Sequence, residues 1–140
     1  MIKLSPIRST LLLACMLAAA NSFTADTSSQ PDLEASTDSG VSIQVFSQLS
    51  PFQINQMHSW TIRLLDSDNS PLTGASIEVT GGMPDHDHGL PTQPQITDEV
   101  DEGVYLLEGV RFHMQGRWEI TITVRSGGEE SQALIEFQLQ

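Results

Sequence analysis

The sequence predicts an all-β protein, an immunoglobulin-like antiparallel β-sandwich of six to seven strands over residues 41–140. Three observations lead to this fold class. Apolar and polar residues alternate with a period of two from Val41 onward, as they do in half-buried strands. Clusters of turn-forming residues separate the alternating runs, and no segment has the period and length of a helix. The length of 140 residues fits one domain, although a small β-barrel would show similar spacing.

The alternating runs give the order of the expected strands. Their apolar positions are, in chain order, Val41-Ile43-Val45, Trp60-Ile62-Leu64, Ile77-Val79, Trp118-Ile120-Ile122-Val124, and the segment from Leu134 to Leu139. Turns are expected at residues 66–71, Gly81-Gly82, residues 101–103, Gly116 and Gly127-Gly128. The tryptophans and the Gly-x-Tyr at 103–105 suit a sandwich, although the cysteine pair of true immunoglobulin domains is missing.

The first twenty residues have the features of an export signal. A basic start (Lys3, Arg8) precedes an apolar run from Leu11 that ends in an Ala-x-Ala cleavage pattern. The run is about half of the roughly 20 residues that cross a bilayer, so no membrane span is expected after cleavage near Asn21. The alternative is a lipoprotein acylated at Cys15. We expect a signal peptide over 1–20 and a periplasmic or secreted protein.

Residues 21–40 are rich in Ser, Thr and Asp and have two large apolar side chains, Phe23 and Leu33. They are expected to form a flexible polar leader before the domain. The chain after residue 20 has four Arg, no Lys and eighteen Asp and Glu, which gives a net charge of four minus eighteen, or −14. Such a surface repels nucleic acid and anionic lipid. Cleavage also removes the only Cys, so disulfides and thiolate metal sites are excluded from the mature chain.

Histidine and methionine gather in three short patches of the mature chain. These patches contain all four His and every Met beyond the signal segment: Met57-His58, Met83 to His88, and His113-Met114. Thioether sulfur is a soft ligand and imidazole a borderline one, so this mixture favours copper, in either oxidation state, over calcium or magnesium. Zinc is less expected without Cys.

Strand phase suggests which of these side chains point inward. His58 keeps phase with Trp60, and Met114 keeps phase with Trp118, whereas His113 falls on the opposite, polar phase and is expected mainly at the surface. His86 and His88 lie in a loop, where an extended backbone would put their Cα atoms roughly 6.6 Å apart, close enough to share one ion. Each of these residues also has an ordinary structural explanation: a satisfied rim histidine, a core methionine or a solvated loop.

Other motifs fail. Asp66-x-Asp68-x-Ser70 imitates the start of a calcium loop, but Pro71 stands where Gly is required, so a hairpin turn is expected. No Gly-x-Ser-x-Gly, P-loop or dinucleotide fingerprint is present, and the protein is not expected to be an enzyme.

The stretch from Gly82 to Pro94 resembles the YtkA-like (FixH-like) domain family. Further landmarks of the resemblance are His58-x-Trp60, Pro71-Leu72-Thr73-Gly74-Ala75, Gly103-Val104-Tyr105, Phe112-His113-Met114-Gln115-Gly116 and Trp118. The resemblance implies a small exported or membrane-tethered immunoglobulin-like sandwich, of a kind found among proteins of metal handling or respiratory-oxidase assembly. Its pattern falls on His58, Met83, His86, His88 and Met114 and does not require His113.

These observations together predict an exported accessory protein that binds copper through His86 and His88, with His58, Met114 and Met83 completing or supporting the site. Its expected partner is a copper-receiving or oxidase-assembly protein. The alternative is a periplasmic protein–protein interaction module in which the histidine loop is structural, because loops on a rigid sandwich are common recognition sites.

Overall fold

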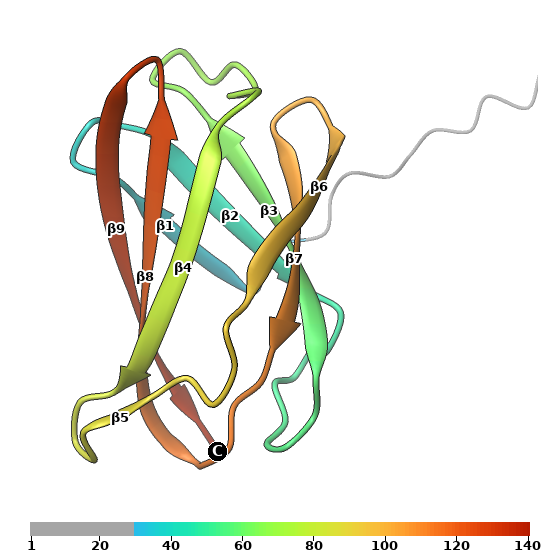
Figure 1. Ribbon diagram of the computed structural model, residues 1–140, viewed down its shortest axis with the longest axis vertical. Coiled ribbons are helices and arrows are strands. Elements are labelled where there is room, and N and C mark those ends of the chain that lie inside the picture. The colour runs from blue at the N-terminus through green and yellow to red at the C-terminus, as the bar shows by residue number, and fades with distance from the viewer. Residues whose placement is uncertain (1–29) are drawn as a thin grey trace, which may run out of the picture.

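The computed structural model describes residues 30–140, which form two antiparallel sheets packed face to face (Figure 1). The predicted all-β sandwich is confirmed, and residues 30–140 contain no helix. The strands are β1 (Leu33–Ser36), β2 (Ser42–Ser47), β3 (His58–Leu65), β4 (Ser76–Met83), β5 (His88–Gly89), β6 (Gln95–Asp101), β7 (Val104–Val110), β8 (Gly116–Ser126) and β9 (Glu129–Leu139).

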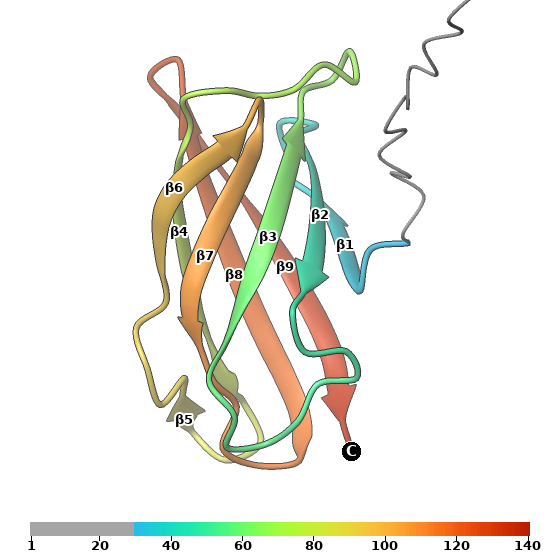
Figure 2. The same cartoon turned by 90° about the vertical axis from the view of Figure 1, so that its right-hand side faces the viewer.

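One sheet has the strand order β1-β2-β3-β7-β6 and the other the order β5-β4-β8-β9. The view turned by 90° shows the five-stranded sheet in front of the four-stranded one (Figure 2). The chain changes sheet between β3 and β4, between β5 and β6, and between β7 and β8. In the part of the chain that the structure describes, no helix is long and apolar enough to cross a membrane.

The core lies between the sheets and follows the predicted alternation. In β3 every second side chain from His58 to Leu64 is buried, and β8 alternates in the same way from Trp118 onward. The largest side chains in the core are Trp60, Trp118, Tyr105 and Phe112, each at most 2% exposed. Since a buried apolar side chain of this size contributes about 1.5–3 kcal/mol, this aromatic group is a major part of the folding free energy.

Tyr105 ties β7 to the segment that leads into β4. Its hydroxyl donates to the carbonyl of Leu72 at 2.7 Å and accepts from the N–H of Ala75 at 2.9 Å. Burial raises the pKa of Tyr105, so the phenol stays protonated and able to donate. The side chain thereby fixes the connection that carries the chain from one sheet to the other.

The turn at residues 66–70 is built on one carboxylate. The Oδ1 atom of Asp66 accepts the N–H groups of Asp68 and Ser70, both at 2.9 Å, and an antiparallel bridge joins Leu65 to Pro71. The carboxylate therefore accepts hydrogen bonds from its own turn, as in an Asx turn. The chain reverses here as expected, but β3 and β4 belong to different sheets, so the turn does not join a hairpin of these two strands.

Several expectations need correction. Residues 33–36 were expected in the flexible leader but form β1, because Leu33 and Ala35 pack on the core while their backbone pairs with β2. The structure has nine strands where six to seven were expected, and the alternating runs correspond to only five of them: β2, β3, β4, β8 and β9. β1 and the two-residue β5 are too short to give a pattern, and β6 and β7 were not among the runs. Leu134 is 56% exposed, so the inward phase of β9 is that of Ala133 and Ile135.

Gly81 and Gly82 lie inside β4, not in the expected turn. A Cβ on Gly81 would lie 2.6 Å from the carbonyl oxygen of Glu119, and one on Gly82 would overlap the carbonyl oxygen of His88. The two glycines therefore allow β8 and β5 to approach β4 closely, which is a second reason for glycine in a strand. The expected signal peptide, its cleavage site and Cys15 lie outside the described residues.

Candidate metal centre

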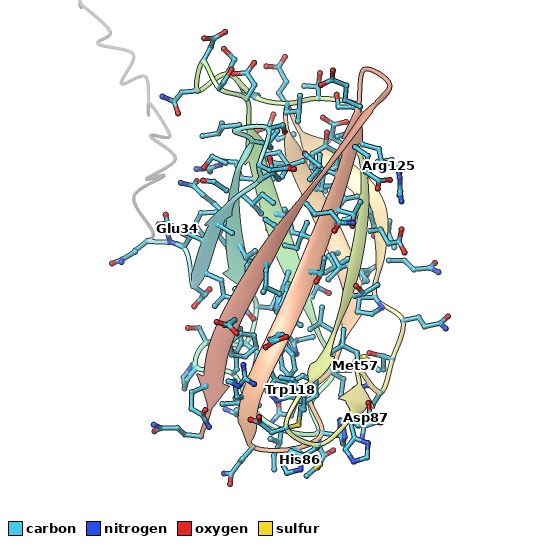
Figure 3. The ribbon with its side chains drawn as sticks, turned by 90° about the vertical axis from the view of Figure 1, so that its left-hand side faces the viewer. Glu34, Met57, His86, Asp87, Trp118 and Arg125 are labelled. Carbon is cyan, nitrogen blue, oxygen red and sulfur yellow. The ribbon has the colours of Figure 1, made fainter. Side chains whose placement is uncertain are left out.

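All the histidines and methionines of residues 30–140 are carried by one end of the sandwich. The loops before β3, between β4 and β6, and between β7 and β8 meet at the lower end in Figures 1 and 2. In the view with side chains, His86 and Asp87 lie at this end with Trp118 just above them, whereas Arg125 lies near the opposite end (Figure 3). We call this the histidine end: residues 54–58, 83–90 and 111–116.

His86 and His88 lie in the short loop that follows the end of β4 and includes β5. The N–H of His86 donates to the carbonyl of Met83 at 3.0 Å, and the N–H of Leu90 donates to the carbonyl of Gly81 at 2.9 Å. Asp87 at the turn has a positive φ of 52°, a conformation that Asp tolerates better than most residues. The backbone therefore closes the loop and leaves the two imidazoles exposed.

Arg117 of β8 attaches this loop to the sheet. Its guanidinium reaches the carboxylate of Asp85 at 3.1 Å and those of Glu119 and Glu136 at 2.7 and 3.1 Å. The hydrogen bonds and charge of Arg117 lower the pKa of Asp85. Three carboxylates face one guanidinium, so the local charge is negative and favours the approach of a cation.

Three imidazoles lie in a row across two loops. The ring centroids of His86 and His88 are 6.4 Å apart with nearly parallel planes, and those of His88 and His113 are 5.9 Å apart with an edge-to-face arrangement. Two imidazoles that bind one ion have centroids roughly 5–6.5 Å apart, since each metal–nitrogen bond is about 2 Å long. Both neighbouring pairs have the spacing that a shared ion requires.

Two buried side-chain nitrogens of this end, Nε of Arg111 and Nδ1 of His113, have no hydrogen-bond partner within residues 30–140. The ring of His113 packs edge-on against Trp118 with centroids 5.5 Å apart. A buried polar atom without a partner costs about 1–3 kcal/mol, so such atoms are rare. The His113 ring lies beside that of His88 and has one nitrogen without a hydrogen bond, which a ligand can reach only after the ring turns to expose it.

His58 is occupied by structural hydrogen bonds. Its Nδ1 atom donates to the carbonyl of Gln56 at 3.1 Å, and its Nε2 atom accepts from Nε1 of Trp60 at 3.2 Å. A carbonyl only accepts, so this pattern requires the neutral ring with its proton on Nδ1. Burial lowers the pKa of His58, with the bond to Gln56 opposing the shift. The expected inward position is found, but neither ring nitrogen is free for a metal.

The three methionines differ in their relation to the imidazoles. Met83 pairs directly with His88 across β4 and β5, so their side chains leave the same face with Cβ atoms about 4.5–5.5 Å apart. Met83 is 1% exposed, and its Cε atom is 2.7 Å from the place of a Cβ on Gly116. Met114 is half-buried against the core, and Met57 is 60% exposed. Met83 is thus the methionine next to the row.

No group of three His, Cys, Asp or Glu side chains within residues 30–140 is arranged to hold a metal as it stands. The row contains two neighbouring pairs of imidazoles, His86–His88 and His88–His113, and Met83 is paired with His88 across β4 and β5. A site here therefore needs either a small rotation of the exposed His86 ring or a sulfur donor from Met83. Two imidazoles with a thioether form a soft to borderline donor set, which suits copper better than zinc.

His113 is the candidate that the sequence did not reveal. Its period-two phase placed it on the polar side, but β8 begins only at Gly116, and the chain bends at residues 114–115 between them. Strand phase does not carry through a bend, so it could not indicate where the ring points. The signal that was available is its membership of the same His and Met patches as the loop histidines.

Comparison with known proteins gives one match. A family model described as YtkA-like matches residues 35–123, which include every strand from β2 to β7, most of β8 and the whole histidine end. Searches of curated proteins and of solved structures returned no match.

Proposed function

The chain belongs to the YtkA-like family, and we propose that it is an exported accessory protein that binds copper at the histidine end. The proposal rests on the His and Met side chains that this chain gathers at one end of the sandwich. His88 and His113 are the central ligands, His86 is the third imidazole, and Met83 supplies a thioether. His58 and Met114, expected as ligands from the sequence, are not ligands in this proposal, because His58 is fully hydrogen-bonded and Met114 packs against the core.

The observation that carries this proposal is the free Nδ1 atom of His113. The atom is buried without a partner, and the ring of His88 lies 5.9 Å away from that of His113. A metal ion would satisfy this nitrogen once the His113 ring turns to expose it, whereas no hydrogen bond within residues 30–140 does so. The negative charge around Arg117 holds a cation near the row.

The proposed role is to carry or buffer copper for another exported protein, in metal handling or the assembly of a respiratory oxidase. The arrangement suits transfer because His86 and His88 are exposed while His113 and Met83 lie deeper. A receiving protein can therefore approach the ion from the side of the exposed ligands. The role that we propose includes no catalysis and no organic cofactor.

The test is a titration of the purified protein with Cu(I) and with Cu(II), each against a competing chelator, with Zn(II) for comparison. Tryptophan fluorescence gives a second signal, because one of the two tryptophans, Trp118, packs against His113. The variants are His88→Ala and His113→Ala, with Gln115→Ala as an exposed control in the same bend. We expect one equivalent of copper and roughly tenfold weaker binding or more, about 1.4 kcal/mol, in each histidine variant.

Other outcomes assign a different role. If His88→Ala and His113→Ala bind copper as the unchanged protein does, the histidine end is not the metal site. If the protein itself binds no copper, the alternative of an interaction module is favoured. The hydrogen bonds of His58 already fit that alternative, because they are structural.

A further inference from the structure

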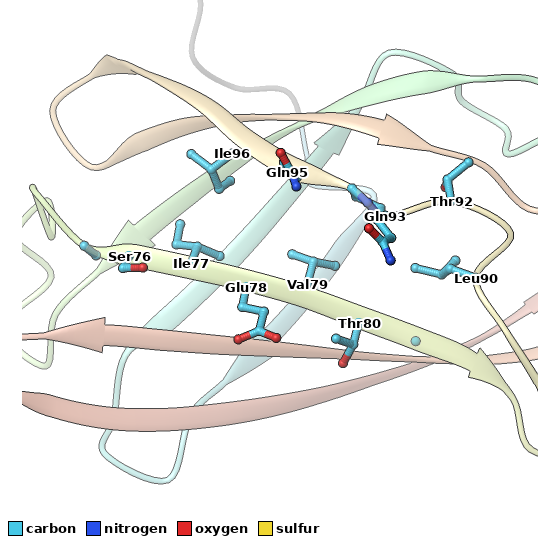
Figure 4. Close-up of a pocket in the computed structure, with 13 residues that line it drawn as sticks. Ser76, Ile77, Glu78, Val79, Thr80, Leu90, Thr92, Gln93, Gln95 and Ile96 are labelled. Atoms are coloured by element: carbon cyan, nitrogen blue, oxygen red, sulfur yellow. The ribbon is translucent and has the colours of Figure 1, made fainter.

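The side of the sandwich between β4 and β6 is open, away from the histidine end. A groove of about 720 Å³ runs here, lined by residues 75–81 along β4, by Leu90, and by residues 92–96 before and within β6 (Figure 4). β4 and β6 are edge regions of different sheets. β5 pairs with β4 only at Gly82 and Met83, so no strand of residues 30–140 lies beside the remainder of this edge of β4.

The edge of β4 offers backbone groups to the groove. The carbonyl of Gly81 accepts the N–H of Leu90 on this side, whereas β4 pairs with β8 without interruption on the other. Since backbone groups point to alternate sides along a strand, the N–H and C=O of Ile77 and Val79 face the groove as well. Neither residue pairs with a strand on that side within residues 30–140.

The inner wall of the groove is apolar. The side chains of Ile77 and Val79 point toward β6 and Ile96, with Leu90 at the end nearest β5 (Figure 4). At the same end lies Thr92, whose hydroxyl is buried without a hydrogen-bond partner. A strand placed along β4 would bury alternate side chains on this apolar wall and come within reach of that hydroxyl.

The outer row beside the groove is polar, and the strand across the groove is acidic. Ser76, Glu78 and Thr80 point away from the inner wall, so they would neighbour the outward side chains of an added strand. The carboxylate of Glu78 is already paired with the guanidinium of Arg125 at 3.2 Å. β6, across the groove, carries Asp98, Glu99 and Asp101. The chain as a whole has a net charge of −12. Opposite charges across neighbouring strands stabilise a sheet and like charges destabilise it, so the outward positions of an added strand favour Lys or Arg.

From these features we propose that the edge of β4 binds an extended segment of a partner protein, in which small apolar residues alternate with basic ones, as an additional antiparallel or parallel strand. Backbone hydrogen bonds to Ile77 and Val79 hold the segment, as in other cases of strand addition. The apolar wall of the groove and the carboxylates of β6 select its side chains. A second copy of this chain fits poorly, because it has the same net negative charge and the outward side chains of its own β4 include no Lys or Arg. This proposal does not depend on copper.

The test uses a short peptide of alternating lysine and valine with blocked ends, added to the full protein and followed by NMR. Two matched peptides serve as controls: one has glutamate for lysine, and the other has N-methylated valines that cannot complete the backbone ladder. We expect saturable shifts confined to β4 and residues 90–96, and at least tenfold slower hydrogen exchange of the Ile77 and Val79 amides. Both control peptides should bind at least tenfold more weakly.

The variant Ile77→Pro removes one N–H that faces the groove and leaves the pairs with β8 in place, a position where an edge strand tolerates proline. It should lose peptide binding, while Ile77→Val keeps it. If Ile77→Pro does not fold, the N-methylated peptide still tests whether backbone hydrogen bonds hold the segment. Equal binding of the glutamate or N-methylated peptide, shifts outside the groove, or self-association through β4 would each overturn the proposal.

Discussion

The position of the histidine loop should depend on the absence of a side chain at Gly82. A Cβ at this position would lie well inside the 3.0 Å that real Cβ contacts almost never enter, and the atom it meets is the backbone carbonyl oxygen of His88. Backbone cannot rotate away as the end of a side chain can. In a Gly82→Ala variant β5 must therefore move away from β4.

The size of the effect follows from the bonds that hold β5. The segment is attached by the pairs Gly82–Gly89 and Met83–His88 and by the bond from Leu90 to Gly81. Losing two of the backbone hydrogen bonds that attach β5 to β4, at about 0.5–1.5 kcal/mol each, lowers the free energy of unfolding by about 1–3 kcal/mol. A binding site tolerates displacements of about 0.5 Å, so the same movement of His88 should weaken copper binding roughly tenfold or more.

Gly89→Ala is the matched control, because a Cβ there meets nothing closer than the carbonyl of Gly81 at 3.7 Å. Its stability should stay within about 0.5 kcal/mol of the unchanged protein. Urea unfolding, hydrogen exchange of the Leu90 amide and the copper titration compare the two variants. Equal stability, equal exchange and equal copper affinity in Gly82→Ala and Gly89→Ala would refute the reasoning.

Three further predictions concern stability and charge. Burial lowers the pKa of His58, so His58 binds a proton at a higher pH in the unfolded chain than in the folded one. The free energy of unfolding therefore falls as the pH drops below about 6.5. This decrease in the free energy of unfolding, about 1 kcal/mol for the bond from Trp60, should be smaller in His58→Phe when urea midpoints at pH 7.5 and 5.5 are compared. An equal pH dependence in both proteins would show that His58 does not cause it. In Arg117→Gln the pKa of Asp85 should rise toward its ordinary value in an NMR titration of the carboxyl carbon, and an unchanged pKa would show that Arg117 does not act on it. Tyr105→Phe leaves the carbonyl of Leu72 and the N–H of Ala75 without their partner and should cost about 1–3 kcal/mol in urea unfolding, whereas a cost near zero would mean that water replaces the hydroxyl.

The sequence predicted the fold where burial follows a simple period. Trp60, Ile62, Trp118 and Ile120 all lie in the core, as alternation indicated. It did not predict β1, because four residues beside a polar segment give too little alternation. It also misplaced Gly81-Gly82, since a turn and a close approach of strands require glycine for the same steric reason.

The candidate metal centre was predicted in part. The patches of His and Met do come together at one end, but which nitrogen is free depends on hydrogen bonds that composition cannot show. His58 is fully hydrogen-bonded to Gln56 and Trp60, while His113 has a buried nitrogen without a partner. Strand phase ranked these two residues in the opposite order, because it describes direction along a strand and not the bonding of each ring.

The histidine end is assembled from three connections that are distant in the sequence and are carried by strands of both sheets. An insertion or deletion in one connection leaves the register of the long β8–β9 pair, and hence the frame, unchanged. Donor atoms can thus be exchanged one loop at a time during evolution. The same property makes this sandwich a scaffold on which an engineer can graft a ligand set and vary each donor separately.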